Sequence, residues 1–233
     1  YAPSADTHRS PFGGRNADYF SEDGLLAGKL AAKIISGAME KGVFCFFKHF
    51  AVNDQETDRE YNGILVWANE QAMRELYLKP FELAVKEGQA GGMMSSFNRL
   101  GMTWAGGSYA LLTEVLREEW GFQGMVITDY SMNRYTYVDQ MIRAGGDLFL
   151  TQDAKTFSMA DDATQVTLLR KATKNILYTV VNSNVMALEV DGYNMPVWKA
   201  VMFVVDGILA VGLSAWGILV ISRSRKKRPD DPN

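Results

Sequence analysis

The sequence predicts an α/β fold built from alternating strands and helices, followed by one membrane-spanning helix. Short apolar runs of strand length recur along the chain, and stretches with helical spacing of apolar residues separate them. Each apolar run ends in polar residues, which gives the rhythm of a βα-repeat fold. The spanning helix is predicted by residues 200–221, which are mostly apolar and include one charged residue, Asp206.

Length and composition exclude few classes of function. The 233 residues suffice for one sizeable domain, and a formal net charge of -3 gives no indication of a nucleic-acid partner. The single cysteine, Cys45, lies in an apolar run and is interpreted as a small buried hydrophobic residue. The chain opens without an initiator methionine or a signal peptide, so we expect it to be a C-terminal fragment of a longer protein.

The first half of the chain contains one complete strand and two helical stretches. Residues 1–23 are rich in Pro, Gly, Ser and charge and predict either a disordered end or a binding loop. A strand over 43–47 ends in Lys48 and His49, a polar loop covers 53–62, and a helix over 68–87 is kinked at Pro80. A helix before Gly42 is expected to pack on the sheet through Leu25, Leu26, Leu30, Ile34, Ile35 and Ala38.

The second half repeats this pattern. Residues 91–98 are a strand candidate, Ser108 is the N-cap of a helix that stops before Gly121, and a strand over 125–128 follows. A helix over 137–144, a short strand over 147–151 and a helix opened by Asp161 and Asp162 complete the series. Four strands are visible where a closed (β/α)8 barrel of TIM type has eight, so the sequence predicts the C-terminal part of such a barrel.

Asp129 directly follows the strand over 125–128. That strand is apolar on both faces, which predicts burial in a parallel sheet. The carboxyl ends of such strands are where α/β barrels gather their functional residues, so Asp129 is a candidate for chemistry. The alternative is that Asp129 only caps the following segment.

Residues at the other strand ends, together with Arg15 on an upstream loop, are expected to gather around Asp129. Cations favour the charged form of a carboxylate, which suits a nucleophile, and their N–H groups suit a polyhydroxylated ligand. Other interpretations stay open: Lys48 as a solvated charge, His49 as a core histidine, Arg15 as a partner of Glu22 or Asp23. We recognise no metal-ligand spacing. The strand-end residues are Lys48, His49, Phe97 and Asn98, while Glu56, Glu70 and Glu75 are interpreted as surface charges.

Five short motifs occur in one order along residues 1–186. They are Gly14-Arg15-Asn16 leading to Ser21-Glu22-Asp23, then Lys48-His49-Phe50 followed by Asn53-Asp54-Gln55-Glu56, then Ser96-Phe97-Asn98, then Leu116-Arg117-Glu118-Glu119-Trp120-Gly121-Phe122-Gln123-Gly124, and Thr128-Asp129-Tyr130. Each motif is weak alone. In this register they resemble glycoside hydrolase family 3, the β-glucosidase family.

The resemblance implies a retaining, exo-acting β-glycosidase that hydrolyses terminal non-reducing β-linked glucosyl residues and needs no cofactor. It implies that Asp129 is the nucleophile that forms a covalent glycosyl-enzyme intermediate. Retention requires a second carboxyl group about 5–5.5 Å away as acid and base, and we identify none here. In the family this group usually belongs to an α/β-sandwich domain, which we expect upstream in the same parent chain. The expected sugar contacts are Arg15, Lys48, His49, Met94 and Phe97.

Some positions depart from the family pattern. Phe97 stands where Tyr is common, so a hydroxyl contact to the nucleophile is lost, and Gly24 replaces a common Pro. Residues 51–54 differ from the Gly- and His-rich loop of the β-N-acetylglucosaminidase branch, which favours the glucosidase and xylosidase branch. From the residues alone, Trp104 is the best aromatic candidate for a leaving-group subsite.

The C-terminal part predicts a membrane anchor. A helix over 200–221 would be about 33 Å long and would match a bilayer core of about 30 Å. The cationic run that begins at Arg223 favours a cytoplasmic C-terminus and an extracellular barrel at the cell membrane. A buried core helix is the alternative. The predicted division is a partial barrel over 1–186, a linker over 187–197, a transmembrane helix over 198–222 and a basic tail over 223–233.

Rival functions remain at this point. They are a β-xylosidase of the same family, a catalytically inactive carbohydrate-binding relative, and a membrane protein whose soluble part is only an assembly module. We expect the chain alone to be inactive or nearly so, because a missing acid/base costs on the order of 10²–10⁴ in rate.

Overall fold

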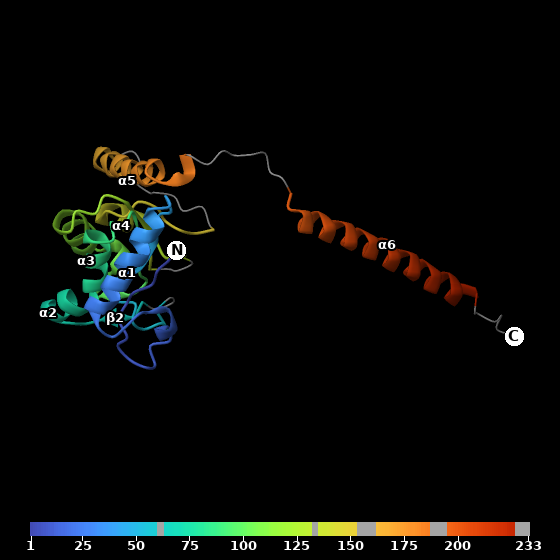
Figure 1. The fold of residues 1–233 in the computed structure, drawn as a ribbon, viewed down its shortest axis with the longest axis horizontal. Helices are drawn as coiled ribbons and strands as arrows, with labels where there is room; N and C mark the ends of the chain where they lie inside the picture. The colour runs from blue at the N-terminus through green and yellow to red at the C-terminus, as the bar shows by residue number, and fades with distance from the viewer. Residues whose placement is uncertain (60–62, 132–134, 153–161, 187–194, 227–233) are drawn as a thin grey trace. The chain divides into compact units, whose positions relative to one another are not determined.

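The computed structural model describes residues 1–59, 63–131, 135–152, 162–186 and 195–226. The chain divides into two units, Tyr1–Leu188 and Glu189–Asn233. The first unit is an α/β domain, as the alternation of apolar runs predicts (Figure 1).

A parallel sheet forms the centre of the first unit. Its strands β1 (Phe46–Phe50), β3 (Gly92–Ser95) and β6 (Met125–Thr128) lie side by side in sequence order. Single parallel bridges, Ser4 to Lys48 and Ile127 to Leu148, extend the row at both edges. All carboxyl ends therefore lie along one edge of the sheet, as in a βα-repeat fold. Closure of this row into a barrel stays a prediction.

The strand bounds correct two expectations. β1 begins at Phe46 rather than at residue 43 and runs to Phe50, so Lys48 and His49 lie within the strand. Residues 147–151 contribute one bridge, at Leu148, instead of a strand. A second small sheet was not predicted, and it consists of β2 (Leu65–Val66), β4 (Arg99–Leu100) and β5 (Thr103–Trp104).

Helix α1 (Gly24–Met39) begins at Asp23, whose carboxylate accepts hydrogen bonds from the amides of Leu25 and Leu26. Its packing face differs from the expected one. Leu25, Leu26, Leu30 and Ile34 are 43–52% exposed, whereas Ala27, Gly28, Ala31, Ala32 and Ile35 are buried. The reason is the close approach of α3, because a Cβ on Gly28 would lie 2.5 Å from Leu83 Cδ1. Large side chains do not fit between the two helices.

The sequence predicts one helix over 68–87 with a kink at Pro80, but the structure has three helical segments there. They are α2 (Glu70–Ala72), the π-helix η2 (Met73–Tyr77) and α3 (Lys79–Lys86). Pro80 lies in the first turn of α3, where a missing N–H group is tolerated, so it begins a helix rather than bending one.

The remaining helices follow the predicted order. Ser108 Oγ accepts a hydrogen bond from the amide of Leu111 at the start of the π-helix η4 (Ala110–Glu119). Helix α4 spans Val138–Ala144, and α5 (Ala163–Val181) is capped by Asp162. Asp161, expected to share that role, lies outside the described residues. Short 3-10 turns are η1 (Asn16–Asp18), η3 (Ala105–Gly107) and η5 (Asn184–Met186).

A buried ion pair ties these elements to the sheet. Arg117 Nη2 lies 2.6 Å from Asp147 Oδ2, and the two side chains are 8% and 1% exposed. The same oxygen accepts from the amide of Val126 at the start of β6, and Asp147 Oδ1 accepts from Asn175 of α5. This ion pair therefore holds the amino end of β6, the strand that Asp129 directly follows.

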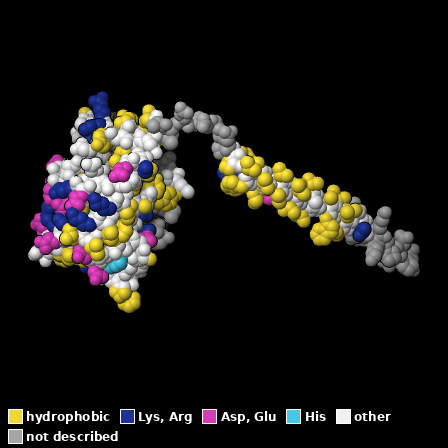
Figure 2. Space-filling view, in the orientation of Figure 1, with side chains coloured by type: hydrophobic (Ala, Val, Ile, Leu, Met, Phe, Trp, Pro, Cys, Tyr) yellow, Lys and Arg dark blue, Asp and Glu magenta, His cyan; other side chains and the backbone are white. Residues whose placement is uncertain are grey.

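The described part of the second unit, residues 195–226, forms one helix, α6 (Val197–Lys226). Its segment Val197–Arg223 contains an 18-residue window with a mean hydropathy of 2.2 and is long and apolar enough to cross a membrane. Figure 2 shows hydrophobic side chains covering its visible face. Much of the expected linker, over 187–194, and the tail after residue 226 lie outside the described residues.

Candidate active site

Asp129 lies at the carboxyl end of β6, as the sequence predicts. Its amide donates to the carbonyl of Ser95 on the neighbouring strand β3, which fixes its backbone. Its Oδ1 accepts from the amide of Tyr130, and its side chain is 16% exposed. The carboxylate is thus held by the backbone and still reachable from solvent.

His49 contacts Asp129 from β1. Its Nε2 lies 3.4 Å from Asp129 Oδ2, while Asn53 Nδ2 approaches its Nδ1 at 3.1 Å. Arg15 Nη1 also lies 3.3 Å from His49 Nε2. The imidazole is therefore held between Asn53, Arg15 and the carboxylate of Asp129, and it is only 1% exposed.

The backbone around His49 is held by the buried carboxylate of Asp6. Oδ2 of Asp6 accepts from the amide of His49 at 2.9 Å, and Oδ1 accepts from the amide of Asn53 at 2.8 Å. Asp6 is 2% exposed. The segment before it pairs with β1, because Ala5 N donates to Lys48 O and Lys48 N donates to Pro3 O. The start of residues 1–23 is therefore an ordered part of the sheet edge.

Arg59 is the second contact of Asp129. Its Nη1 lies 3.2 Å from Asp129 Oδ2 and 3.1 Å from Asn53 Oδ1, and its Nε lies 2.8 Å from Glu56 Oε2. The guanidinium also lies over the Phe97 ring, 5.1 Å from its centroid. These contacts hold a planar cation in one orientation beside the carboxylate.

Arg15 reaches the same cluster from the upstream loop. Its Nη1 lies 3.2 Å from Glu56 Oε1 and 3.3 Å from His49 Nε2, and its Nε lies 2.9 Å from Asp18. Burial opposes its charge, but the attraction of Glu56 and the hydrogen bonds to Asp18 and Glu56 outweigh burial and raise the pKa of Arg15. Glu22 and Asp23, the other partners considered for Arg15 from the sequence, do not pair with it in the structure. Asp23 caps α1 instead.

Tyr19 and Asn53 complete the second layer of the cluster. The Tyr19 hydroxyl donates to the carbonyl of Asn53, and Asn53 Nδ2 lies 3.0 Å from Glu56 Oε1. Burial raises the pKa of the Tyr19 phenol, and the charges of Asp6 and Glu56 raise it further. The phenol therefore keeps its proton and its role as a donor.

Lys48 is half-buried in β1, directly before His49. Within the described ranges, its ammonium group forms no ion pair and no hydrogen bond with another side chain, so it can meet a ligand. The part of the chain that the structure describes contains no group of three His, Cys, Asp or Glu side chains arranged to hold a metal ion.

The other expected contacts are core residues in this structure. Met94 is 3% exposed and packs with Met125 and Ile127. Phe97 is 4% exposed and touches the site through Arg59. Trp104 is 2% exposed, and its indole N–H donates to Ser96 O. Its burial leaves no exposed ring face for a sugar, which corrects its expected place in a leaving-group subsite.

Five residues of the cluster were not predicted as contacts from the sequence: Asp6, Tyr19, Asn53, Glu56 and Arg59. Glu56 was interpreted as a surface charge, but it binds Arg15 and Arg59 together. A signal was available, because Asn53 and Glu56 belong to one of the family motifs and Arg59 follows Glu56 at ion-pair spacing.

The matches to known proteins cover most of the first unit. The model of the glycosyl hydrolase family 3 N terminal domain matches residues 1–182. A β-glucosidase of Ruminococcus albus is 35% identical over 200 residues, which are 79% of this chain and 21% of that protein. β-Glucosidase B of Emericella nidulans is 44% identical over 147 residues, which are 63% of this chain and 17% of that protein.

Solved structures agree with this match. A β-glucosidase from Paenibacillus barengoltzii superposes with a TM-score of 0.74 at 35% identity, over 83% of this chain and 23% of that one. β-Glucosidase 3B from Thermotoga neapolitana in complex with α-D-glucose gives 0.69 at 32% identity, over 78% and 27%. The chain therefore spans about a fifth to a quarter of the length of these relatives.

Proposed function

The chain belongs to glycoside hydrolase family 3, and from this membership we propose that it carries the nucleophile and part of the sugar site of a retaining β-glycosidase. Its substrates are terminal, non-reducing β-linked glucosyl residues. One observation carries the proposal: Asp129 directly follows strand β6, and the nitrogens His49 Nε2 and Arg59 Nη1 lie 3.4 and 3.2 Å from its Oδ2. β-Glucosidases among the relatives support the class of reaction.

In this mechanism an oxygen of Asp129 attacks the anomeric carbon as the bond to the leaving-group oxygen breaks. A general acid protonates that oxygen, and the product is a glycosyl ester of Asp129. Water, activated by the same group as a base, then cleaves the ester and restores the carboxylate. His49 and Arg59 orient Asp129, while Lys48 and Arg15 supply donors to sugar hydroxyls.

The general acid is proposed to lie outside this chain. Glu56 is the carboxylate nearest to Arg59 in the cluster, but its two oxygens are occupied by Arg15, Asn53 and Arg59. It is therefore poorly placed to deliver a proton to a leaving group. The chain alone is accordingly proposed to turn over substrate slowly or not at all.

A mechanism-based label tests the assignment of Asp129. The full-length protein is treated with an activated 2-fluoro glucoside, and the labelled peptide is identified by mass spectrometry. We expect the label on Asp129 and none in the Asp129→Asn variant. No label on a folded protein, with other 2-fluoro glycosides failing too, would favour an inactive sugar-binding relative. Faster labelling by the xyloside would favour a β-xylosidase.

Sugar affinity separates a glycosidase from an assembly module. Lys48→Ala removes a half-buried cation without breaking any ion pair in the described part of the chain. We expect it to weaken glucose binding measured by calorimetry, while the matched surface variant Lys29→Ala binds as the parent does. Equal binding by both variants would count against the sugar site.

We further propose that α6 spans the cell membrane with the first unit outside. Its 27-residue, mostly apolar segment Val197–Arg223 and the cationic run that begins at Arg223 support this orientation. Leu209→Arg places a charge near the centre of the span, at a cost of about 2.5–3.5 kcal/mol. We expect it to reduce co-flotation of the chain with vesicles, whereas Leu209→Ile floats normally. Equal flotation of both would argue against a span.

A further inference from the structure

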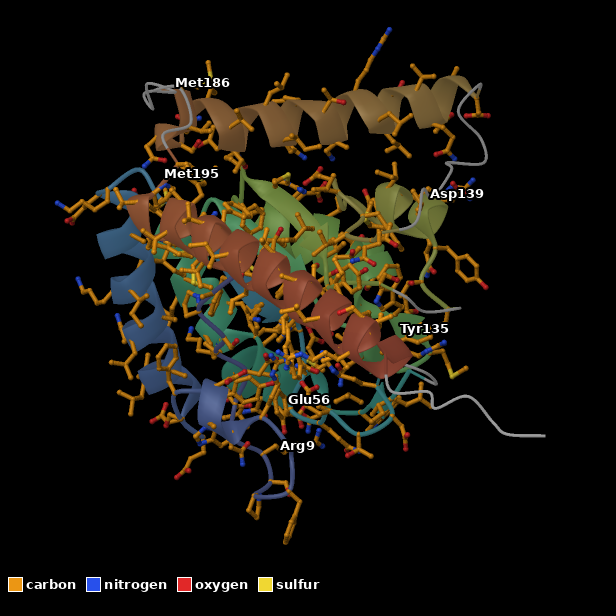
Figure 3. All side chains as sticks on the ribbon, turned by 90° about the vertical axis from the view of Figure 1, so that its right-hand side faces the viewer. Arg9, Glu56, Tyr135, Asp139, Met186 and Met195 are labelled. Atoms are coloured by element: carbon orange, nitrogen blue, oxygen red, sulfur yellow. The ribbon has the colours of Figure 1, made fainter. Side chains whose placement is uncertain are left out.

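A cleft of about 630 Å³ opens beside the Asp129 cluster. Its walls come from the loop over residues 9–13 and from residues 54, 55 and 64–67. Neither Asp129 nor its contacts His49 and Arg59 line it. Figure 3 labels Arg9, which lines the cleft, and Glu56, which directly follows the lining residue Gln55. The cleft is thus a second concave surface built on the loops that also carry Arg15 and Glu56.

One oxygen atom of a buried carboxylate in this cleft lacks a hydrogen-bond partner among the described residues. Asp54 lines the cleft with a side chain that is 3% exposed, and its Oδ2 accepts from Arg9 Nη1 at 3.0 Å. Its Oδ1 is buried and has no hydrogen-bond partner among the residues that the structure describes. A buried oxygen in this state is costly, and a ligand hydroxyl would supply the missing donor.

Arg9 is presented as a fixed donor beside Asp54. Its guanidinium lies over the Tyr77 ring, 5.4 Å from the centroid, and its side chain is 42% exposed. The neighbouring Gln55 is exposed and brings an amide to the same wall. Carboxylate, guanidinium and amide groups together match the mixed donors and acceptors of vicinal hydroxyls.

Two aromatic side chains stand at the cleft with most of their surface in solvent. Trp67 is 83% exposed and Phe12 is 91% exposed. The flat apolar faces of these rings suit the C–H faces of pyranose rings.

We propose that this cleft is a saccharide-binding site, separate from the Asp129 site, that holds a β-linked gluco-oligosaccharide through Trp67, Phe12 and the Arg9–Asp54 pair. The proposal rests on the proposed function, because a β-glycosidase meets oligosaccharides as substrates. The role of this saccharide-binding site is to hold the oligosaccharide near the loops of the Asp129 cluster. Glu56 N donates to Gly13 O, so the two sites share one pair of loops.

The test measures binding of cellotetraose to the full chain by calorimetry, in an Asp129→Asn background that prevents turnover. We expect Trp67→Ala and Phe12→Ala each to weaken binding about tenfold, as loss of an aromatic anchor does. Asp54→Asn, which disturbs the pair with Arg9, should weaken it as well. Tyr109→Ala removes another exposed aromatic side chain, 53% exposed and outside the cleft lining, and should bind as the parent does.

Unchanged affinity in folded Trp67→Ala and Phe12→Ala variants would overturn the proposal and leave a protein contact as the use of these rings. Because both positions are exposed, neither variant should fail to fold. The outcome is separable from that of the glycosidase proposal. A label on Asp129 with no cleft binding removes the second site alone, whereas cleft binding with no label removes the catalytic assignment alone.

Discussion

Arg59 bridges two carboxylates that belong to different parts of the chain. Its Nη1 lies 3.2 Å from Asp129 Oδ2 and its Nε lies 2.8 Å from Glu56 Oε2, with 12% of the side chain exposed. The loop after β1 is therefore connected to the end of β6 by one planar cation. The position of the Asp129 carboxylate therefore depends on a residue 70 positions earlier.

Replacing Arg59 should impair the reaction of Asp129 directly. We expect Arg59→Ala in the full-length protein to slow labelling by the activated 2-fluoro glucoside about 10²-fold, because one preorganised donor is lost. Arg74→Ala removes an arginine whose partners Glu70 and Glu119 are on the surface, and it should label at the parent rate. Equal rates for both variants would contradict the role of Arg59.

Glu56 should act by positioning Arg15 and Arg59. Glu56→Ala frees both guanidinium groups and is expected to lower kcat/KM about tenfold or more through misplacement. Glu56→Gln keeps one acceptor oxygen and should recover part of the loss. The separate measurement of kcat and KM, together with urea unfolding, distinguishes positioning from simple destabilisation. Equal activity of the Ala and Gln variants would argue against a positioning role for Glu56.

The buried pair of Arg117 and Asp147 should be important for stability. Burial lowers the pKa of Arg117 and raises that of Asp147, and the attraction between the two charges opposes both shifts. Arg117→Met leaves Asp147 without its cation and should lower the free energy of unfolding by about 3–5 kcal/mol. Urea titration measures this loss. The exposed pair Lys29–Glu87 offers a control, since Lys29→Ala should cost about 0–1 kcal/mol.

A surface carboxylate gives a pH test of stability. Burial opposes the ionisation of Glu82, but hydrogen bonds from Lys86 and Lys79 outweigh it and lower the pKa of Glu82 below its ordinary value of 4.5. Its contribution is then complete above pH 4.5 and is lost as the pH falls through the lower, folded-state value. Glu82→Gln should cost about 0.2–1 kcal/mol at pH 7. The gap between the variant and the parent should shrink at pH 3.5, and a constant gap would contradict the assignment.

Local patterns in the sequence identify Asp129, because a buried strand and the residue after it are adjacent. The N-cap at Asp162 follows for the same reason, since a cap acts on amides two or three residues ahead. The strand-end pattern adds His49 and the upstream loop adds Arg15 to the candidates, and the structure brings both into the cluster with Asp129. Their catalytic roles stay predictions.

Arg59 and Glu56 could not be placed in this way. They lie on an irregular loop without periodicity, and their contacts depend on how that loop folds over the sheet edge. The packing face of α1 was mispredicted for a related reason. Large apolar residues were assigned to the buried face, but the short distance to α3 admits only small ones there, as at Gly28. Such distances depend on a neighbouring element and leave no pattern within the helix itself.

The pairing of Pro3 and Ala5 with β1 bears on where this gene can be cut for expression. A version that starts a few residues later would lose the carboxylate of Asp6, which binds the amides of His49 and Asn53. It would also leave β1 with an unpaired edge. Deleting these residues from the full-length protein would therefore lower its activity although the side chain of Asp129 is intact, and the loss would be mistaken for a defect in Asp129. Boundaries for recombinant work therefore belong upstream of Pro3.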